Sequence, residues 1–381
     1  MLFNYTFGNF RKGSNYTFGN FKMASNYTFG NFAVLVIRAK FGKNYYKSGQ
    51  VRGFMCPVPD FVVDLMTNCV GCKRCLKVCP SHKYGGCSPW LSMIAKDPRT
   101  EMCIGCGKCS EVCRHTNPKL VMMYLKAEKI GAKVPEIFNQ CGYVLPPASD
   151  DWKKEVPEYT DGRDVFYMPG CIVQGKVPYL KYAVTKAFEA VGVHAGELYE
   201  NTCCMYPLPL RPMDEARRTE YKVKARGNAA GRDLVTLCSG CTNELATSGV
   251  YAPHICTYFV KYLDKIRALP GLKGKKVAFE PGCSSERFAS DFRLIVEATG
   301  VEIINKGYGC CGKSIPDISD KLMADRQAEC QGADFIVVGC PNCQTFYDNV
   351  PGGIPVVHLS ELIAMAAGDY ETMKFHKLRF R

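Results

Sequence analysis

The cysteines of this 381-residue sequence are the residues whose spacing most clearly implies chemistry. Between positions 171 and 343 a five-cysteine pattern occurs twice, as one cysteine after Pro-Gly, an adjacent pair and a Cys-x2-Cys. The first set is Cys171, Cys203, Cys204, Cys238 and Cys241, and the second is Cys283, Cys310, Cys311, Cys340 and Cys343. We interpret this region as an internal duplication of about a hundred residues. Five thiolates brought together in each copy would form a site for a metal cluster.

Upstream, two runs have the spacing of a two-cluster ferredoxin, Cys-x2-Cys-x2-Cys-x3-Cys. In such proteins the first three cysteines of a run ligate one cluster and the fourth ligates the other. The spacing therefore predicts two cubane [4Fe–4S] clusters. Cluster 1 would be held by Cys69, Cys72, Cys75 and Cys113, and cluster 2 by Cys103, Cys106, Cys109 and Cys79. Two structural zinc sites are the alternative, although zinc has no use for this interleaving.

Short apolar runs lead directly into the cysteines of the duplicated region. They are Val165–Met168 and Leu234–Leu237 in the first copy, and Val277–Phe279 and Phe335–Val338 in the second. Helical patterns lie between these runs, which favours a small parallel sheet in each copy. Because ligands bind at the carboxyl edge of such sheets, the cysteines are expected to meet there.

The predicted fold class is a multidomain α+β and α/β chain, with a helical two-cluster ferredoxin-type domain followed by the duplicated α/β cysteine-rich domain. The ferredoxin-type part includes a helix expected over Leu120–Ile130 and ended by Gly131. The expected boundaries are a basic aromatic arm over 1–54, the ferredoxin-type domain over 55–145, a linker over 146–163, the two copies over 164–270 and 271–368, and a basic tail over 369–381. The arm repeats Asn-Tyr-Thr-Phe-Gly-Asn-Phe three times and is expected to be poorly ordered. The tail is expected to be solvated from Lys374 onward.

Composition argues against several classes of protein. An odd number of cysteines and no signal-peptide pattern argue against a secreted disulfide scaffold, and no apolar run is long enough to span a membrane. Of the net charge of +13, eight positive charges lie in the arm, and the rest of the chain carries only about +5. Because the body of the protein is only modestly basic, no nucleic-acid partner is expected. No dinucleotide-binding glycine motif is present, so electrons would come from a partner protein. We expect a cytoplasmic protein, held at the membrane surface where that partner is itself a membrane protein.

The duplicated pattern resembles the cysteine-rich CCG domain in the B-type subunit of heterodisulfide reductase, and the two-cluster segment resembles the C-type subunit. A single chain with both, in this order, is similar to the D-type subunit, over about residues 56–368. The resemblance implies a small-molecule substrate, the mixed disulfide of coenzyme M and coenzyme B, reduced to two thiols. It implies that electrons pass through the two cubane clusters to two noncubane [4Fe–4S] clusters, each ligated by one five-cysteine set. A membrane cytochrome b or a flavin–hydrogenase assembly would be the electron-donating partner.

One position departs from the family pattern. The second adjacent pair is followed by Gly312, as in the family, but the first is followed by Met205, which must reshape that side of the site. An alternative is therefore an electron-transfer component of a thiol:fumarate, glycerol-3-phosphate, lactate or glycolate oxidoreductase, in which a flavin-containing partner performs the chemistry. A zinc-ribbon module for nucleic acid is the alternative from a different class.

Several residues outside the cysteine sets are candidates for supporting roles. Lys313, Arg211 and Arg287 lie near the cysteine loops and are candidates for binding the anionic groups of the coenzymes. His254 and His358 follow the two Cys-x2-Cys motifs; they could donate protons, but their recurrence favours a shared structural role such as a helix-start contact. The remaining cysteines are assigned no role. These are Cys56, Cys87, Cys141, Cys256 and Cys330.

Overall fold

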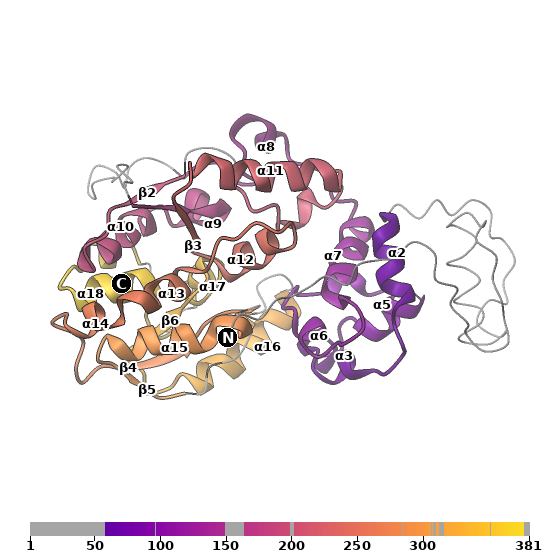
Figure 1. Ribbon diagram of the computed structural model, residues 1–381. Helices are drawn as coiled ribbons and strands as arrows, with labels where there is room; N and C mark the ends of the chain where they lie inside the picture. The colour runs from indigo at the N-terminus through magenta and orange to yellow at the C-terminus, as the bar shows by residue number, and fades with distance from the viewer. Residues whose placement is uncertain are drawn as a thin grey trace, which may run out of the picture.

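The computed structural model of the chain describes residues 58–95, 97–148, 164–198, 202–283, 285–305, 307, 310–311, 316–350 and 352–376. The predicted arm and most of the predicted linker lie outside the described residues. So do Cys56, Gly312 and Lys313. Figure 1 shows most helices of the two-cluster part, in indigo and purple, at one end of the molecule, and the two sheet-containing halves at the other.

The two-cluster part is helical throughout its described residues. Its longer helices are α2 (Asp60–Thr67), α5 (Pro89–Ala95) and α7 (Pro118–Lys129), and the following helix α8 (Glu136–Cys141) packs on the first sheet-containing half. The short helices α3 (Arg74–Lys77), α4 (Pro80–Lys83) and α6 (Lys108–Glu111) and the turn η1 (Thr100–Met102) accompany the cysteine runs. Val62, Met93 and Val121 form the buried centre of this part. The chain thus holds its cysteine loops on a small helical core.

Helix α7 confirms the helix predicted over Leu120–Ile130, with a start two residues earlier. The side chain of Asn117 accepts a hydrogen bond from the backbone N–H of Leu120 at 3.1 Å, and Pro118 occupies the first turn. An asparagine cap followed by proline is a favoured helix start, because proline has no N–H to leave unpaired. Gly131 follows with a positive φ of 59° and ends the helix as predicted.

The cysteine-rich part contains two parallel sheets of similar order. In the first half, the strand order is β2-β1-β3, with β1 (Val165–Met168), β2 (Ala195–Glu197) and β3 (Asp233–Thr236). In the second half, the order is β5-β4-β6-β7, with β4 (Lys276–Glu280), β5 (Glu302–Ile303), β6 (Phe335–Val338) and β7 (Val356–His358). All pairings are parallel. The predicted apolar runs are therefore confirmed as strands, to within one or two residues at their ends.

Helices cover both sheets. They are α9 (Gly170–Lys176), α10 (Leu180–Ala190), α11 (Glu215–Asn228), α12 (Ser239–Ala246), α13 (Ile255–Phe259), α14 (Leu263–Arg267), α15 (Ala289–Ala298), α16 (Pro316–Glu329), α17 (Pro341–Tyr347) and α18 (Leu359–Ala366). The turns η3 (Leu208–Leu210), η4 (Val260–Tyr262), η5 (Glu286–Phe288) and η6 (Glu371–Phe375) complete this part.

The two halves exchange helices and share one hydrophobic core. Helix α18 of the second half packs against α10 of the first, beside which it lies in Figure 1, and α13 of the first packs against α15 of the second. A single buried cluster accordingly includes Tyr167 and Phe188 together with Phe279, Val337 and Leu362. The two halves therefore have one core in common, because each contributes a helix to the other.

The two histidines singled out in the sequence interlock the halves. His254 is the N-cap of α13 and His358 the N-cap of α18, each accepting a backbone N–H at 3.3 Å through Nδ1. Since Nδ1 accepts, Nε2 carries the proton and donates. His254 Nε2 donates to the carbonyl of Gly339 at 2.8 Å, and His358 Nε2 donates to that of Leu237 at 3.0 Å. Each histidine therefore bonds to the other half.

These histidine contacts confirm the predicted helix-start role. Burial lowers the pKa of His254 to about 3 and also lowers the pKa of His358, so both rings are neutral. Both nitrogens of each ring are already engaged in hydrogen bonds. A role as proton donors to a substrate is therefore not supported.

The start of the C-terminal tail corrects the sequence-based expectation. Phe375 stacks on Tyr179 with ring centroids 5.4 Å apart, and His376 is buried with Nε2 2.7 Å from Oε1 of Glu361. The prediction of a solvated tail from Lys374 onward is wrong for these residues, because an aromatic and a histidine close over the second half. Within the described residues, no helix has the length and apolar character needed to cross a membrane.

Candidate iron–sulfur sites

The four cysteines predicted to hold cluster 2 line one pocket, together with Ile104, Gly105 and Lys119. Cys103, Cys106 and Cys109 come from one loop and Cys79 from the other run, so the fold brings the crossing cysteine to the other run's loop. Backbone N–H groups point at two of the sulfurs, from Gly105 to Cys103 at 3.4 Å and from His82 to Cys79 at 3.4 Å. Hydrogen bonds to ligand sulfurs are a feature of protein-bound iron–sulfur clusters. This pocket fits the predicted group.

The cysteines predicted to hold cluster 1 also lie together. Burial, and then the nearby thiols of Cys69, Cys113 and Cys72, raise the pKa of Cys75 to about 11. The backbone N–H of Gly71 lies 3.5 Å from the Cys69 sulfur. As for cluster 2, the fourth member comes from the other run. Helices α3 and α6, which carry Cys75 and Cys109, pack together and make the two sites neighbours.

The ten cysteines of the duplicated pattern gather where the two halves meet, here called the seam. The sulfurs of Cys171 and Cys203 are 3.5 Å apart, those of Cys311 and Cys343 are 3.6 Å apart, and Cys238 and Cys340 face each other across the seam at 3.6 Å. Cys204 and Cys241 lie in one packed cluster of the first half, and Cys283 packs beside Cys310 in another. We call this arrangement the seam array. Both five-cysteine sets lie at the carboxyl ends of their strands, where the sequence predicted them.

Glycine is required in both Pro-Gly-Cys turns. Gly170 and Gly282 have φ of 75° and 94°, which is the left-handed region that disfavours side chains. A Cβ on Gly170 would lie 3.4 Å from the Cys241 sulfur, and one on Gly282 would lie 3.2 Å from Cβ of Cys340. The glycines therefore let the first cysteine of each set approach the Cys-x2-Cys of the same set.

Several of the buried thiols have little tendency to ionise without metal, whereas hydrogen bonds from neighbouring thiols lower the pKa of Cys171 and Cys238. Burial raises the pKa of Cys106 to about 12, and contact with Cys283 and Cys311, together with burial, raises the pKa of Cys310 well above its usual value. Removing a thiolate from water is costly unless a positive charge replaces the lost solvation. Bound iron would supply that charge and hold coordinating thiols deprotonated.

The predicted site of cluster 2 lies between the predicted site of cluster 1 and the seam array. Cys106 and Ile104 pack with Cys310, and Ile318 and Leu322 of α16 complete this apolar contact. Helix α16 lies beside the two-cluster part in Figure 1. On the side of the first half, the hydroxyl of Tyr206 donates to the carbonyl of Gly105 at 3.2 Å. The loop that carries cluster 2 therefore touches both halves of the seam.

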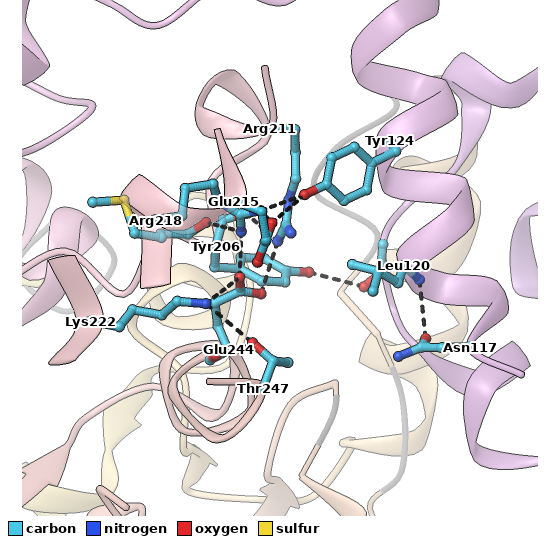
Figure 2. Close-up of polar contacts among 12 residues, drawn as sticks. Asn117, Leu120, Tyr124, Tyr206, Arg211, Glu215, Arg218, Lys222, Glu244 and Thr247 are labelled. Atoms are coloured by element: carbon cyan, nitrogen blue, oxygen red, sulfur yellow. Dashed lines mark hydrogen bonds and ion pairs between the residues drawn. The ribbon is translucent and has the colours of Figure 1, made fainter. Parts of the chain in front are cut away.

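A buried charged network, which sequence analysis did not anticipate, fixes the loop after the first cysteine pair. Its members are Arg211, Glu215, Arg218, Lys222 and Glu244, joined by Tyr124 of α7 and by Tyr206. Figure 2 shows these side chains, with Tyr124 on one side and Glu244 of α12 on the other. Glu244 binds Arg218 at 2.5 Å, Arg211 at 2.9 Å and Lys222 at 3.5 Å. We refer to this group of five charged residues and two tyrosines as the arginine–glutamate network.

The network joins three elements that carry cysteines. Arg218 donates to the carbonyl of Met205 at 3.0 Å and Arg211 to that of Tyr206 at 3.2 Å. Glu244 lies one helical turn after Cys241, so the Cys-x2-Cys helix is held to the same loop. The hydroxyl of Tyr124 donates to Glu215 at 2.7 Å and ties in the two-cluster part. Burial would raise the pKa of Glu244, but Arg211, Arg218 and Lys222 outweigh it and lower that pKa.

Met205 shows how the chain accommodates its departure from the glycine of the family pattern. Its φ is 63°, the left-handed conformation that glycine adopts without strain, and its side chain is fully buried. That side chain packs with Leu210, Phe138 and Cys203. The backbone thus keeps a glycine-like turn after the cysteine pair. The hydrogen bond from Arg218 and the apolar contacts hold methionine in that turn.

The three residues predicted to bind substrate anions lie in different surroundings. Arg211 is buried and paired with Glu244, so it is part of the arginine–glutamate network rather than free to bind a substrate. Arg287 is exposed and donates to the side chain of Asn243 across the seam. Lys313 lies outside the described residues. Sequence analysis gave no role to Tyr206 or Glu244, which follow Cys204 and Cys241 by two and three residues.

Comparison with known protein families defines the class to which these sites belong. Residues 61–114 match the model of a 4Fe-4S dicluster domain, and residues 165–246 and 277–347 match that of a cysteine-rich domain named CCG. The first match contains all eight cysteines predicted to hold clusters 1 and 2, and it ends one residue after Cys113. The second covers both five-cysteine sets. These matches support iron–sulfur clusters in both parts of the chain.

Two proteins of methanogenic organisms are similar to the cysteine-rich part. The chain is 26% identical over 267 aligned positions to the B-type subunit of the ferredoxin/F(420)H(2)-dependent CoB–CoM heterodisulfide reductase of Methanosarcina acetivorans, covering 52% of this chain and 87% of that protein. It is 25% identical over 265 positions to the B-type subunit of the ferredoxin:CoB–CoM heterodisulfide reductase of Methanosarcina mazei, with the same coverage. The chain is therefore an iron–sulfur protein related to the B-type subunits of heterodisulfide reductases.

The arginine–glutamate network predicts a large effect of removing its central carboxylate. Glu244→Gln leaves Arg211, Arg218 and Lys222 buried with too little negative charge, so the free energy of unfolding should fall by about 3–5 kcal/mol. Anaerobic chemical denaturation measures this change. Glu220→Gln, on the exposed side of α11, should leave the midpoint unchanged. A Glu244→Gln protein as stable as that control would show that the network does not stabilise the fold.

The left-handed conformation of Met205 predicts an unusual order of stability. Both Met205→Ala and Met205→Gly lose the buried side chain, but alanine keeps the left-handed strain, so the glycine variant should be more stable by about 1 kcal/mol. At Met168, a buried methionine in strand β1, the order should reverse because glycine weakens a strand. Denaturation midpoints of the four variants test this. An alanine variant at 205 as stable as the glycine variant would contradict the prediction.

Proposed function

We propose that the chain is an iron–sulfur oxidoreductase component that reduces the coenzyme M–coenzyme B heterodisulfide to its two thiols. The observation that carries this proposal is the seam array, in which two complete five-cysteine sets meet through Cys238 and Cys340, 3.6 Å apart. The array would hold two noncubane [4Fe–4S] clusters, and the two-cluster part would hold two cubane clusters. The similarity to the B-type subunits of two heterodisulfide reductases supports this reading.

The reaction requires electrons delivered one at a time and two separate binding sites, one for each sulfur atom of the cleaved disulfide. Splitting a disulfide into two thiols takes two electrons and two protons. When bound, the clusters supply electrons one at a time and iron atoms that accept thiolate sulfur. The residues of the chain provide two five-cysteine sites side by side, so that the two halves of one substrate have neighbouring positions. A single five-cysteine site would not offer this.

The arrangement of the sites gives the proposed electron route a direction. Cluster 1 lies next to cluster 2, whose loop packs against Cys310 of the second half. We therefore propose that electrons enter at cluster 1 and reach the seam array from cluster 2. The hydrogen bond from Tyr206 to Gly105 keeps the same loop against the first half.

The surface over cluster 1 suits an electron-donating partner. Cys72 is exposed there, Val70 is 57% exposed, and the neighbouring Lys73, Arg74 and Lys77 are exposed as well. An apolar centre with a basic rim is suited to an acidic protein surface, which it would attract over short distances. The partner proposed from the sequence, a membrane cytochrome b or a flavin–hydrogenase assembly, would deliver electrons at this surface.

Arg287 is the described cation best placed to bind a substrate anion. It follows Cys283 in the chain, is exposed, and reaches across the seam to Asn243. A guanidinium in that position can form charge-assisted hydrogen bonds to a phosphate or sulfonate group. We propose that it helps position the substrate beside the seam array.

Electron transfer alone is a second candidate function, and Met205 is the observation that favours it. The first five-cysteine set has lost the glycine of the family pattern, and a set without its cluster would leave one noncubane site. The chain would then relay electrons to another protein that carries the chemistry, as proposed for thiol:fumarate, glycerol-3-phosphate, lactate or glycolate oxidoreductases. The five ligands of the first set are nevertheless all present at the seam.

The adjacent cysteine pairs provide the test that separates these functions. Cys311→Ala and Cys204→Ala should each lose or convert one noncubane cluster while sparing both cubane clusters. Both should abolish reduction of the heterodisulfide, because each half of the product needs its own site. Iron content and electron paramagnetic resonance of anaerobic protein measure the clusters. Cys330→Ala, a buried cysteine outside the pattern, is the matched control and should keep both iron and activity.

The result for Cys204→Ala decides between the two functions. If this variant keeps its iron while Cys311→Ala loses about four irons, and wild-type protein with a chemical electron donor does not reduce the heterodisulfide, the first five-cysteine set holds no cluster. The relay function would then replace the proposed disulfide reduction.

A further inference from the structure

Cys87 is a fifth cysteine at the site of cluster 2. It belongs to neither ferredoxin-type run, yet it lines the same pocket as Cys79, Cys103, Cys106 and Cys109. Its buried thiol shares this lining with the thiols of Cys79 and Cys103, and the three are close enough to affect one another's pKa. The sulfur is therefore next to two of the four proposed ligands and faces the space that the cluster would fill.

The loop around Cys87 is built to hold the thiol in this position. The hydroxyl of Ser81 accepts the backbone N–H of Cys87 at 3.1 Å and lies 3.3 Å from its sulfur, while donating to the carbonyl of Met102 at 2.8 Å. A Cβ on Gly86 would lie 2.2 Å from the Ser81 hydroxyl oxygen and 2.9 Å from the Ser81 carbonyl oxygen. Only glycine permits this close approach, so Gly86 and Ser81 together fix the position of Cys87.

Cluster 1 differs in this respect. The thiols that act on Cys75 there are those of Cys69, Cys113 and Cys72, all of which belong to the predicted ligand set. Cluster 2 has the corresponding four cysteines and, in addition, Cys87. Two sites with the same spacing in the sequence thus differ in the number of thiols around them.

A buried cysteine is often only a small apolar side chain. Cys87 differs from that case, because its sulfur lies 3.3 Å from the Ser81 hydroxyl oxygen and lines a pocket with four other cysteines. Cys79, by contrast, is half-buried, and its sulfur also caps helix α4 by accepting the N–H of His82. Cys87 is therefore well placed to bind the same iron atom of the cluster that Cys79 would bind.

We propose that Cys87 is a reserve ligand of cluster 2 that binds iron in place of Cys79. The exchange moves protons but no electrons: Cys87 loses its thiol proton as it binds iron, and Cys79 takes up a proton as it leaves. This inference rests on the assignment of cluster 2 proposed above. It assigns a metal-binding role to a cysteine outside the ferredoxin pattern.

Iron content of anaerobically purified variants tests the proposal, with cluster 1 as the internal control. Cys113→Ala removes the crossing ligand of cluster 1, where the thiols that raise the pKa of Cys75 all belong to the predicted ligand set, and should lose about four irons per chain. Cys79→Ala removes the equivalent ligand of cluster 2 but should keep its iron, with a shifted electron paramagnetic resonance signal. Cys87→Ala should keep all its iron. Cys79→Ala/Cys87→Ala should lose about four irons.

Three outcomes would overturn the proposal. They are a loss of about four irons from Cys79→Ala alone, the same loss from Cys87→Ala alone, or retention of the cluster by the double variant. If Cys79→Ala does not fold because its helix cap is lost, Cys79→Ser and Cys79→Ser/Cys87→Ala give the same comparison. Wild-type protein without two cubane signals would instead overturn the proposed function, so the two failures are distinguishable.

Discussion

The hydrogen bond that each buried histidine donates across the seam is the interaction on which the arrangement of cysteines depends. His254 binds the carbonyl just before Cys340, and His358 binds the carbonyl just before Cys238. Because each Cys-x2-Cys is anchored by the other half, neither half can place its cysteines alone. The exchanged helices α13 and α18 begin at these histidines, so the same contacts also build the shared core.

A second constraint is the cost of burying charge next to the cysteines. The loop after the first cysteine pair has a strained backbone at Met205, and its carbonyls need donors away from water. Arg218 and Arg211 supply those donors, and Glu244 balances their charges from the Cys-x2-Cys helix. The network thereby links the position of the cysteine pair to that of Cys241. It also reaches Tyr124, which couples the array to the part that would carry the cubane clusters.

The local elements were predictable from the sequence, whereas contacts between the halves were not. Continuous apolar runs such as Phe335–Val338 identify buried parallel strands, and the cysteines that follow them had to lie at one sheet edge. An amphipathic pattern does not reveal which half a helix packs against, so the exchange of α13 and α18 was missed. Arg218 and Glu244 were missed because charged residues are usually at the surface. Cys87 has no recognisable spacing and became informative only through its neighbours.

The central claim is that one chain carries two cubane and two noncubane clusters, the latter side by side at the seam. Quantifying iron in anaerobically purified full-length protein, together with Mössbauer spectroscopy to separate the cluster types, tests it most directly. We predict about sixteen irons per chain, shared equally between cubane and five-cysteine sites. About eight irons, all in cubane clusters, or zinc in place of iron, would contradict the claim.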